Sequence, residues 1–441
     1  MPKKSTLLKE IGNVVNNNYN NINVFDINFD ILKSLNLKMM NLEDSRHSSY
    51  DLHYMNEIVI IVFLALLSNC DEWTQIHMFA VQHEQWLHNF LKLPYGLPSI
   101  STIKRVIAMV DPKDLETICV EFIYEKTSEI ERELHIENKK DIISLDGKEI
   151  NSSGRNNSIN GKIDNIQAMS AYSSKYDMTL ATEFIEEKTN EIPTGPKLLS
   201  RLNLENTIIT FDALNTQEKT IQYIVKNKGD YVAPVKANQG TLYEDLKAYF
   251  DSDELKKEAN CYSEKEKAHS QIEVRDYYLI SDTEWISNKN KWSKLASIGV
   301  VEKTISNLIT GEVKKEVRYY ITSLYDSDLK EFAQAVRSEW EIENNLHWHL
   351  DVTFKEDRNL TSEKTAQKNL NILRKLGLNI LKMAQPLYKL SLKNIRLQLC
   401  MNFEDEFYKI LTLLDKENRR VCQEKCVSYL KFHKNQIVKE Q

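Results

Sequence analysis

Apolar and polar residues follow two different rhythms along the chain, and the change between them divides it. From Tyr54 to about Leu134 apolar positions recur three and four residues apart, which predicts helices. Between about 142 and 235, short apolar runs alternate with predicted helices near 196–202 and 217–228, the pattern of a mixed α/β core. Strand-like runs at 274–280, 296–304 and 313–323 then precede a long predicted helix at 328–352.

The amino-terminal region holds one candidate DNA-reading helix. The first 40 residues are Asn-rich and weakly periodic, so we expect a loosely ordered arm that becomes helical near 29–37. Further on, Leu97-Pro98-Ser99 opens a predicted helix with Ser, Thr, Lys104 and Arg105 on its first turns. This suits the second helix of a helix-turn-helix, with Lys104 and Arg105 on DNA. An ordinary capped surface helix explains the pattern equally well.

Two apolar runs of the predicted α/β core end in an aspartate. Ile-Ile-Ser-Leu precedes Asp146, and Ile-Ile-Thr-Phe precedes Asp212. On neighbouring strands the two carboxylates would lie side by side and repel unless a cation bound, and oxygen ligands favour Mg²⁺ or Mn²⁺. For a single aspartate, capping of the following turn is the simpler interpretation, but the pair favours a metal site.

The long predicted helix offers a third acid in Glu339, Glu341 or Glu343. Glu339 and Glu343 are four residues apart and share a face, but spacing alone does not choose among the three. His347 and Trp348 follow directly. They would either stack on a displaced base or pack, and packing is the favoured interpretation for Trp348.

Charge and composition narrow the class of protein. The length of 441 residues suggests two to three domains. The net charge of −6 excludes a uniformly basic coat for nucleic acid. A local basic surface is predicted between 364 and 403, where no acid occurs, and we expect it to contact DNA. Its basic residues are Lys364, Lys368, Arg374, Lys375, Lys382, Lys389, Lys393 and Arg396.

Cysteine usage and hydropathy predict a reduced, cytoplasmic protein. The six cysteines are scattered, and no zinc-ligand spacing surrounds Cys422 and Cys426. The apolar run at 58–67 is too short to span a bilayer, so it predicts a buried helix and no membrane partner.

Several short motifs occur in one order over about residues 45–410. They are Ser144-Leu145-Asp146-Gly147-Lys148, Ile209-Thr210-Phe211-Asp212-Ala213, Lys236-Ala237-Asn238-Gln239-Gly240, and the stretches 318–321, 337–348 and 350–357. Together they resemble the bacterial insertion-sequence DDE transposases, in the branch that includes the H-repeat-associated proteins.

The resemblance implies an α/β fold with a ribonuclease-H-like mixed-sheet catalytic core. It also implies an all-helical N-terminal domain before the core, a β-rich insertion within it and a helical basic tail after it. The expected parts are a DNA-binding helical domain (1–135), the first part of the core (136–250), the insertion (251–325), the last core helix with the catalytic glutamate (326–360) and the basic C-terminal region (361–441).

The same resemblance implies that Asp146, Asp212 and Glu343 hold two Mg²⁺ ions, with Mn²⁺ as a substitute. Such ions activate a water or 3′-hydroxyl and stabilise the leaving oxygen, which would cut the transposon end and join it to target DNA. The partners would be double-stranded DNA and, on it, a second copy of the chain in the bacterial nucleoid. DNA contacts are expected from Lys148, Lys236, Asn238, Gln239 and Arg337, although Asn238 and Gln239 could instead fix a turn.

The chain departs from the family pattern at Asn151, Gln167 and Glu339, where the family usually has Arg, His and Arg. Two alternatives stay open. One is a metal-dependent nuclease that cuts DNA without joining it, and the other is a transposase-derived DNA-binding protein that has lost catalysis.

Overall fold

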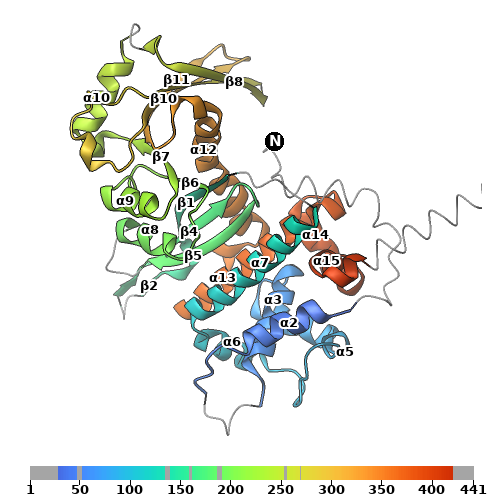
Figure 1. The fold of residues 1–441 in the computed structure, drawn as a ribbon. Coiled ribbons are helices and arrows are strands. Elements are labelled where there is room, and N and C mark those ends of the chain that lie inside the picture. The colour runs from blue at the N-terminus through green and yellow to red at the C-terminus, as the bar shows by residue number, and fades with distance from the viewer. Residues whose placement is uncertain are drawn as a thin grey trace, which may run out of the picture.

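The centre of the molecule is a nine-stranded mixed sheet (Figure 1). The structure is a computed structural model, and it describes residues 28–46, 52–134, 140–157, 161–185, 191–252, 256–268 and 270–420. The strand order is β5-β4-β1-β6-β7-β11-β10-β9-β8. The first five of these strands are β5 (Met178–Ile185), β4 (Ile166–Ser173), β1 (Asp141–Ile150), β6 (Thr207–Phe211) and β7 (Asp230–Val235). The predicted mixed α/β class is therefore confirmed.

Helices cover both faces of this sheet. β1, β4 and β5 are antiparallel neighbours, whereas β1, β6 and β7 run parallel, and β6 is buried over its whole length. Helices α8 (Glu191–Leu199), α9 (Glu218–Lys226) and α10 (Thr241–Phe250) share an apolar core with one face. Helix α12 (Leu329–Ile342) packs on the other, and a Cβ at Gly299 would lie 2.6 Å from the Phe332 ring. Only glycine permits that approach.

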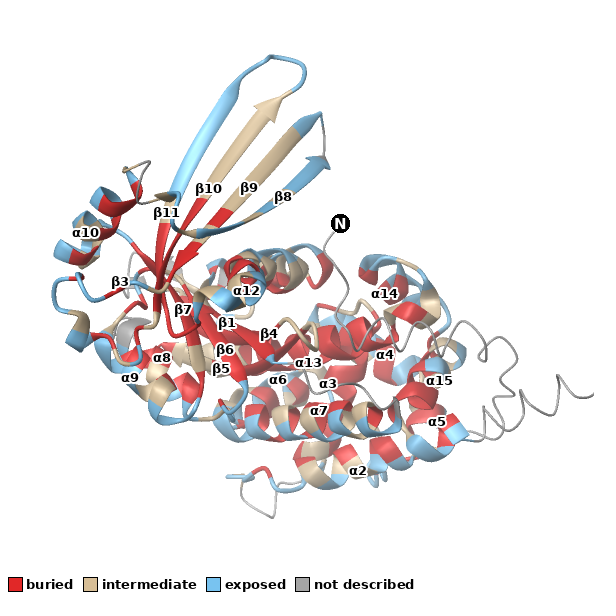
Figure 2. Cartoon of the chain, turned by 45° about the horizontal axis from the view of Figure 1, so that its top comes forward, coloured by how far each residue is buried: buried red, intermediate tan, exposed pale blue. Residues whose placement is uncertain are grey.

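The β-rich segment predicted after residue 250 continues the same sheet. It comprises β8 (Asn260–Ala268), β9 (Gln271–Ile280), β10 (Ser297–Asn307) and β11 (Val313–Thr322), and β11 pairs antiparallel with β7. Figure 2 shows the inner halves of β10 and β11 buried and their outer halves projecting into solvent. The sequence did not predict β8, because this edge strand carries alternating Glu and Lys rather than apolar residues.

The helices before and after the sheet share one apolar core. Helix α3 is buried on all sides, and the long helix α13 contacts α3, α6 and α7 as well as β5 (Figure 1). No described helix is both long and apolar enough to cross a membrane. The helices are α2 (Asp30–Met39), α3 (Met55–Leu67), α4 (Trp73–Gln82), α5 (Glu84–Leu87), α6 (Ile100–Met109), α7 (Pro112–Leu134), α13 (Lys364–Tyr388), α14 (Leu392–Met401) and α15 (Phe403–Leu414). A two-stranded ribbon, β2 (Arg155–Asn157) and β3 (Gly161–Ile163), follows β1.

Helices α13 and α14 correct the prediction of a basic DNA-contacting tail. Four of the eight basic residues between 364 and 403 are buried, so the prediction of DNA contact is wrong for them. They are Arg374, Lys375, Lys382 and Arg396. The run lacks acids because their partners come from other parts of the chain. Lys389 and Lys393 are exposed, and Cys422 and Cys426 lie outside the described residues.

Candidate active site

Asp146 and Asp212 stand at the same level of neighbouring parallel strands. Leu145 of β1 is in register with Phe211 of β6, and each aspartate follows its residue of that pair. The expectation that both strands end at their aspartate holds only for Asp212. β1 continues to Ile150 because its antiparallel pairing with β4 runs on, with Asp146 opposite Ser170.

Glu343 is the glutamate that faces Asp146. Each of Asp146, Glu343 and His347 offers one possible ligand atom, and these atoms lie within 4.8 Å of one another. His347 Nδ1 lies 3.0 Å from Glu343 Oε2 and 3.5 Å from Asp146 Oδ2. The spacing of Glu343 and His347, four residues apart on a helix, was the sequence signal for this contact.

His347 orients the Glu343 carboxylate through a hydrogen bond. Burial lowers the pKa of His347 to about 4, so the imidazole is neutral near pH 7. A neutral ring that faces two carboxylates through Nδ1 carries its proton there and donates to Glu343. Nε2 is buried and has no hydrogen-bond partner in the described part of the chain. Two carboxylates held close together, with a third on the next strand, form a donor set that fits Mg²⁺ or Mn²⁺.

The helix widens where Glu343 enters the site. Helix α12 ends at Ile342, and residues Glu343–His347 and His349–Thr353 are π-helical. Trp348 is half exposed on this segment and contacts His349 edge to face, so the packing predicted for it is only partial. π-Turns are rare and occur frequently at functional sites.

Asp212 has a different environment from Asp146. Asn215 donates to Asp212 Oδ1 from its backbone N–H at 3.1 Å and from Nδ2 at 2.8 Å. Among the described residues, Asp212 is not part of the cluster around His347. Glu339 lies on this side, where burial raises its pKa to about 7, Arg318 and Lys236 oppose the shift and Asp212 adds to it. The position four residues before Glu343 thus holds a largely buried acid.

The two predicted phosphate-binding lysines have different surroundings. Lys148 follows Asp146 by two residues on β1, and its Nζ is 2.7 Å from both carboxylate oxygens of Asp351. That contact orients the lysine toward the π-helical segment. Lys236 is exposed in the turn after β7.

The remaining predicted DNA-binding residues of the core make internal contacts. Arg337 pairs with Glu264 at 3.3 Å and Glu266 at 3.0 Å, which ties α12 to β8. Asn238 Nδ2 and Gln239 Nε2 donate to backbone carbonyls of the loop after β6, at 3.0 and 2.5 Å. These two side chains hold the β6 and β7 loops together beside Asp212.

Lys104 and Arg105 are exposed on α6, which Figure 1 shows well separated from α12. The Ser99 side chain caps this helix by accepting from the Thr102 N–H at 3.2 Å. The predicted capped helix is therefore present, in a part of the molecule distinct from the acidic cluster.

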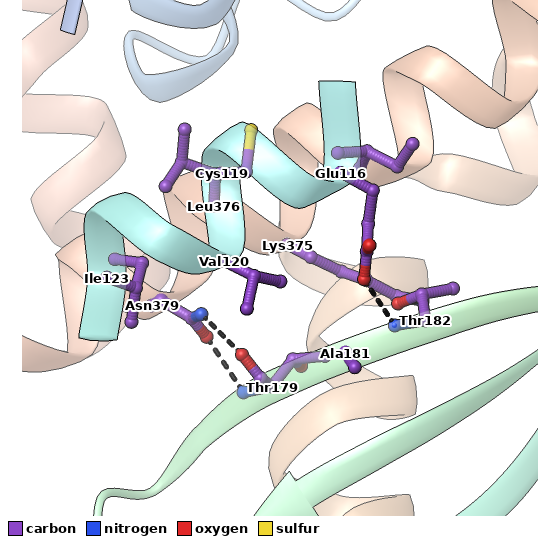
Figure 3. A pocket seen from close by; sticks show the side chains of 11 residues that line it. Glu116, Cys119, Val120, Ile123, Thr179, Ala181, Thr182, Lys375, Leu376 and Asn379 are labelled. Carbon is purple, nitrogen blue, oxygen red and sulfur yellow. Dashed lines mark hydrogen bonds between the residues drawn. The ribbon is translucent and has the colours of Figure 1, made fainter. Parts of the chain in front are cut away.

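A small pocket lies where α7, β5 and α13 meet (Figure 3). Its volume is about 20 Å³, which is room for one water molecule and too little for an organic ligand. Lys375 lines it and donates to Ser170 Oγ and Thr182 Oγ1, both at 2.9 Å. Burial lowers the pKa of Lys375 to about 7. The Asn379 side chain pairs with both backbone groups of Thr179 and so caps edge strand β5.

Known proteins are similar in sequence to most of this chain. Residues 137–380 match the family described as transposase DDE domain, and residues 38–123 match the one described as DDE_Tnp_1-associated. The chain is 31% identical over 357 residues to the putative protein YbfL of Escherichia coli K12, an alignment that covers 79% of this chain and 90% of the relative. It is 30% identical to the H repeat-associated putative transposase YhhI of the same strain, with the same coverage.

The chain therefore belongs to the transposase DDE domain family, and the resemblance inferred from its motifs is confirmed. A solved piggyBac transposase synaptic complex with hairpin DNA aligns over 96% of this chain and 84% of its own, at 12% identity and a TM-score of 0.35. That likeness is too low to support a conclusion about the fold.

Proposed function

We propose that this protein binds the ends of an insertion sequence, cuts them and joins the resulting 3′-ends to target DNA. The observation that carries the proposal is the close approach of Glu343 to Asp146, with Asp212 at the same level on the neighbouring strand. Asp146 and Asp212 stand at one level of adjacent parallel strands, and Glu343 reaches Asp146 from the helix above them. Acids are held this close where a cation binds between them.

The proposal includes a ribonuclease-H-like core. Its support is the strand sequence β5-β4-β1-β6-β7, in which three antiparallel strands lead into two parallel ones, with α12 crossing the face that carries the acids. In this proposal β8 to β11 are an insertion that widens the sheet before the chain returns through α12.

Each side chain has a role in this reaction. Asp146, Asp212 and Glu343 would hold two Mg²⁺ ions, and His347 keeps the Glu343 carboxylate turned toward Asp146. When bound, the ions supply Lewis acidity to the leaving oxygen and to the attacking water or 3′-hydroxyl. Lys148, which pairs with Asp351, would contact a phosphate beside Asp146.

Double-stranded DNA is the proposed partner, both as transposon end and as target, and two copies of the chain are proposed to act together on it. The exposed side chains of Lys104 and Arg105 on α6 would contact the end away from the cut, and Lys236 would contact phosphate near it. Arg337, Asn238 and Gln239 would shape the DNA-facing loops through their internal contacts.

The test is cleavage and joining of a labelled duplex that carries the ends flanking this gene. Wild-type protein is compared with Asp146→Asn and Glu343→Gln in Mg²⁺, Mn²⁺ and chelator. We expect metal-dependent cutting at the end, followed by joining to a second duplex, and a loss of about 1,000-fold or more in both variants. Such a loss corresponds to several kcal/mol of transition-state stabilisation.

Glu331→Gln is the matched control, because Glu331 is an exposed acid on the same helix. It should leave cutting unchanged. Cutting without joining would identify a nuclease. Binding to the ends without cutting, unaffected by either active-site variant, would identify a DNA-binding descendant and overturn the proposal.

A further inference from the structure

The wide helical turn after Glu343 brings a tryptophan to the same side of the helix. The Trp348 N–H donates to the Glu343 carbonyl, and the Phe354 N–H donates to the His349 carbonyl at 3.0 Å. A turn closed by such an i→i+5 bond contains more residues than an α-helical turn, so positions five apart lie closer to one side of the helix than they do in an α-helix. In an α-helix, with 3.6 residues per turn, Trp348 would be rotated well away from Glu343.

Trp348 presents its ring to solvent. Its exposed fraction is 49%, whereas Trp86 and Trp292 are only 4% and 7% exposed. Its aromatic contact within the described part of the chain is with His349, edge to face, with ring centroids 4.9 Å apart. An edge-to-face contact of this kind restricts the orientation of the indole, while about half of the residue stays exposed to solvent.

The other exposed tryptophan near Glu343 already has partners. Trp340 is 47% exposed, and Lys303 Nζ and Arg318 Cζ lie 4.6 and 5.0 Å from its ring centroid. These cation–π contacts bring positive charge to the end of α12 that leads into the acidic cluster. The helix therefore carries one ring covered by cations and one open ring, on either side of Glu343.

We propose that Trp348 stacks on an unpaired base of the DNA strand whose phosphate lies at Asp146 and Glu343. The inference rests on the proposed function, since it needs DNA at that site. Every base has a π-face, so stacking on tryptophan is tolerant of sequence. In a duplex those faces are covered by neighbouring pairs, so the ring reaches a base only at a strand end or after local opening.

Charge complementarity favours DNA over an apolar partner at this ring. Lys303 and Arg318 lie at Trp340 before Glu343, and Lys148 is held by Asp351 three residues after Trp348. A protein partner that buried Trp348 would have to cover these cations and the nearby carboxylates as well, which costs desolvation free energy. A nucleotide meets the same groups with its phosphate outward and its base on the ring.

The test uses an end duplex whose terminal nucleotide is 2-aminopurine, a fluorescent base that is quenched when it stacks on an aromatic ring. Fluorescence on binding and the rate of cutting are both measured for wild type, Trp348→Ala and Trp348→Phe. Trp285→Ala is the control, because Trp285 is also exposed (38%) but lies in the loop after β9, stacked on Tyr249. Circular dichroism checks that each variant is folded.

We expect quenching in wild type and its loss in Trp348→Ala, with cutting of fully paired ends slowed about 5- to 150-fold. Trp348→Phe and Trp285→Ala should quench and cut nearly as wild type does. Ends made with an unpaired terminal base should recover part of the Trp348→Ala loss.

Normal quenching and cutting in Trp348→Ala would overturn the inference and leave the proposed transposase intact. Equal impairment of the Phe and Ala variants would also overturn it, because a stacking role accepts any aromatic ring. A wild-type protein that quenches the base but never cuts would count against the proposed function, and the stacking would still be measured.

Discussion

The acidic cluster at the sheet (Asp146, Glu343 and His347) and the charged residues along α13 and α14 differ in how their charges are arranged. In the cluster, the Asp146 and Glu343 side chains are 34% and 68% exposed, and like charges share one imidazole. In the helical core, Arg396 meets Asp71 at 2.7 Å with both side chains almost fully buried, and Lys382 meets Asp177 at the same distance. One region keeps like charges close together and accessible, and the other pairs opposite charges inside the fold.

This difference separates a site from a scaffold. Carboxylates gathered close together repel one another and destabilise the fold, and such an arrangement is typical of functional sites. Buried opposite charges tie together segments that are far apart in the chain. Arg396 pairs with Asp71 in this way, and it also donates to the carbonyls of Leu66 and Thr353. The basic residues of α13 and α14 therefore report on architecture more than on DNA.

The largest effect on stability is expected from breaking the Arg396 network. Arg396→Ala removes hydrogen bonds to Leu66 and Asp71 and the packing of the guanidinium on the Phe354 ring, 4.2 Å away. It leaves the buried Asp71 with Lys355, 3.5 Å away, as its remaining ion-pair partner among the described residues, and the free energy of unfolding should fall by about 3–5 kcal/mol. Urea unfolding measures this. Lys393→Ala, an exposed cation on the same helix, should change stability by less than about 0.5 kcal/mol, and equal effects would refute the assignment.

An effect of similar size that depends on pH is expected at Lys375. Its pKa of about 7 in the folded protein lies below the ordinary 10.5, so the unfolded chain binds more protons between those values. Stability should therefore rise with pH across that window, because the cost of burying the ammonium is full below pH 7 and is lost by pH 10.

Lys375→Met should remove that dependence. Its stability relative to wild type should fall by roughly 4 kcal/mol as pH rises from 7 to 10. Unfolding curves of both proteins at several pH values measure the difference, and Lys393→Met, which changes an exposed lysine, should show almost none. A constant difference between Lys375→Met and wild type would mean that the buried amine stays protonated throughout.

The same comparison explains what the sequence could reveal. The run of apolar residues before Asp146 and Asp212 predicted two strands and a paired acidic site, since periodicity reports on burial. Spacing alone left Glu339, Glu341 and Glu343 open, and only the resemblance implied Glu343, because the choice depends on which side of α12 faces β1. The exposure of Trp348 was also hidden, since the π-turn that rotates it has no sequence periodicity of its own.

Local charge was the sequence feature that predicted the structure least well. The eight basic residues between 364 and 403 looked like a surface because no acid lies among them in sequence. The acids that pair with Arg396 and Lys382 are hundreds of positions away, at Asp71 and Asp177. A local charge count cannot register a partner that only folding brings close.

The smallest effect on stability, and the sharpest contrast with Arg396, is expected at the acidic cluster itself. Asp146→Asn keeps a side-chain acceptor for the Gly147 N–H and removes one of two neighbouring like charges, so the free energy of unfolding should change by less than about 1 kcal/mol. Mg²⁺ should stabilise the two proteins to different extents. At about ten times its dissociation constant, Mg²⁺ should stabilise wild type by about 1.4 kcal/mol and Asp146→Asn by much less. Thermal unfolding with and without Mg²⁺ measures both quantities. Equal stabilisation of the two proteins would mean that the ion binds elsewhere, and a large loss of stability in the variant would place Asp146 among the scaffold charges.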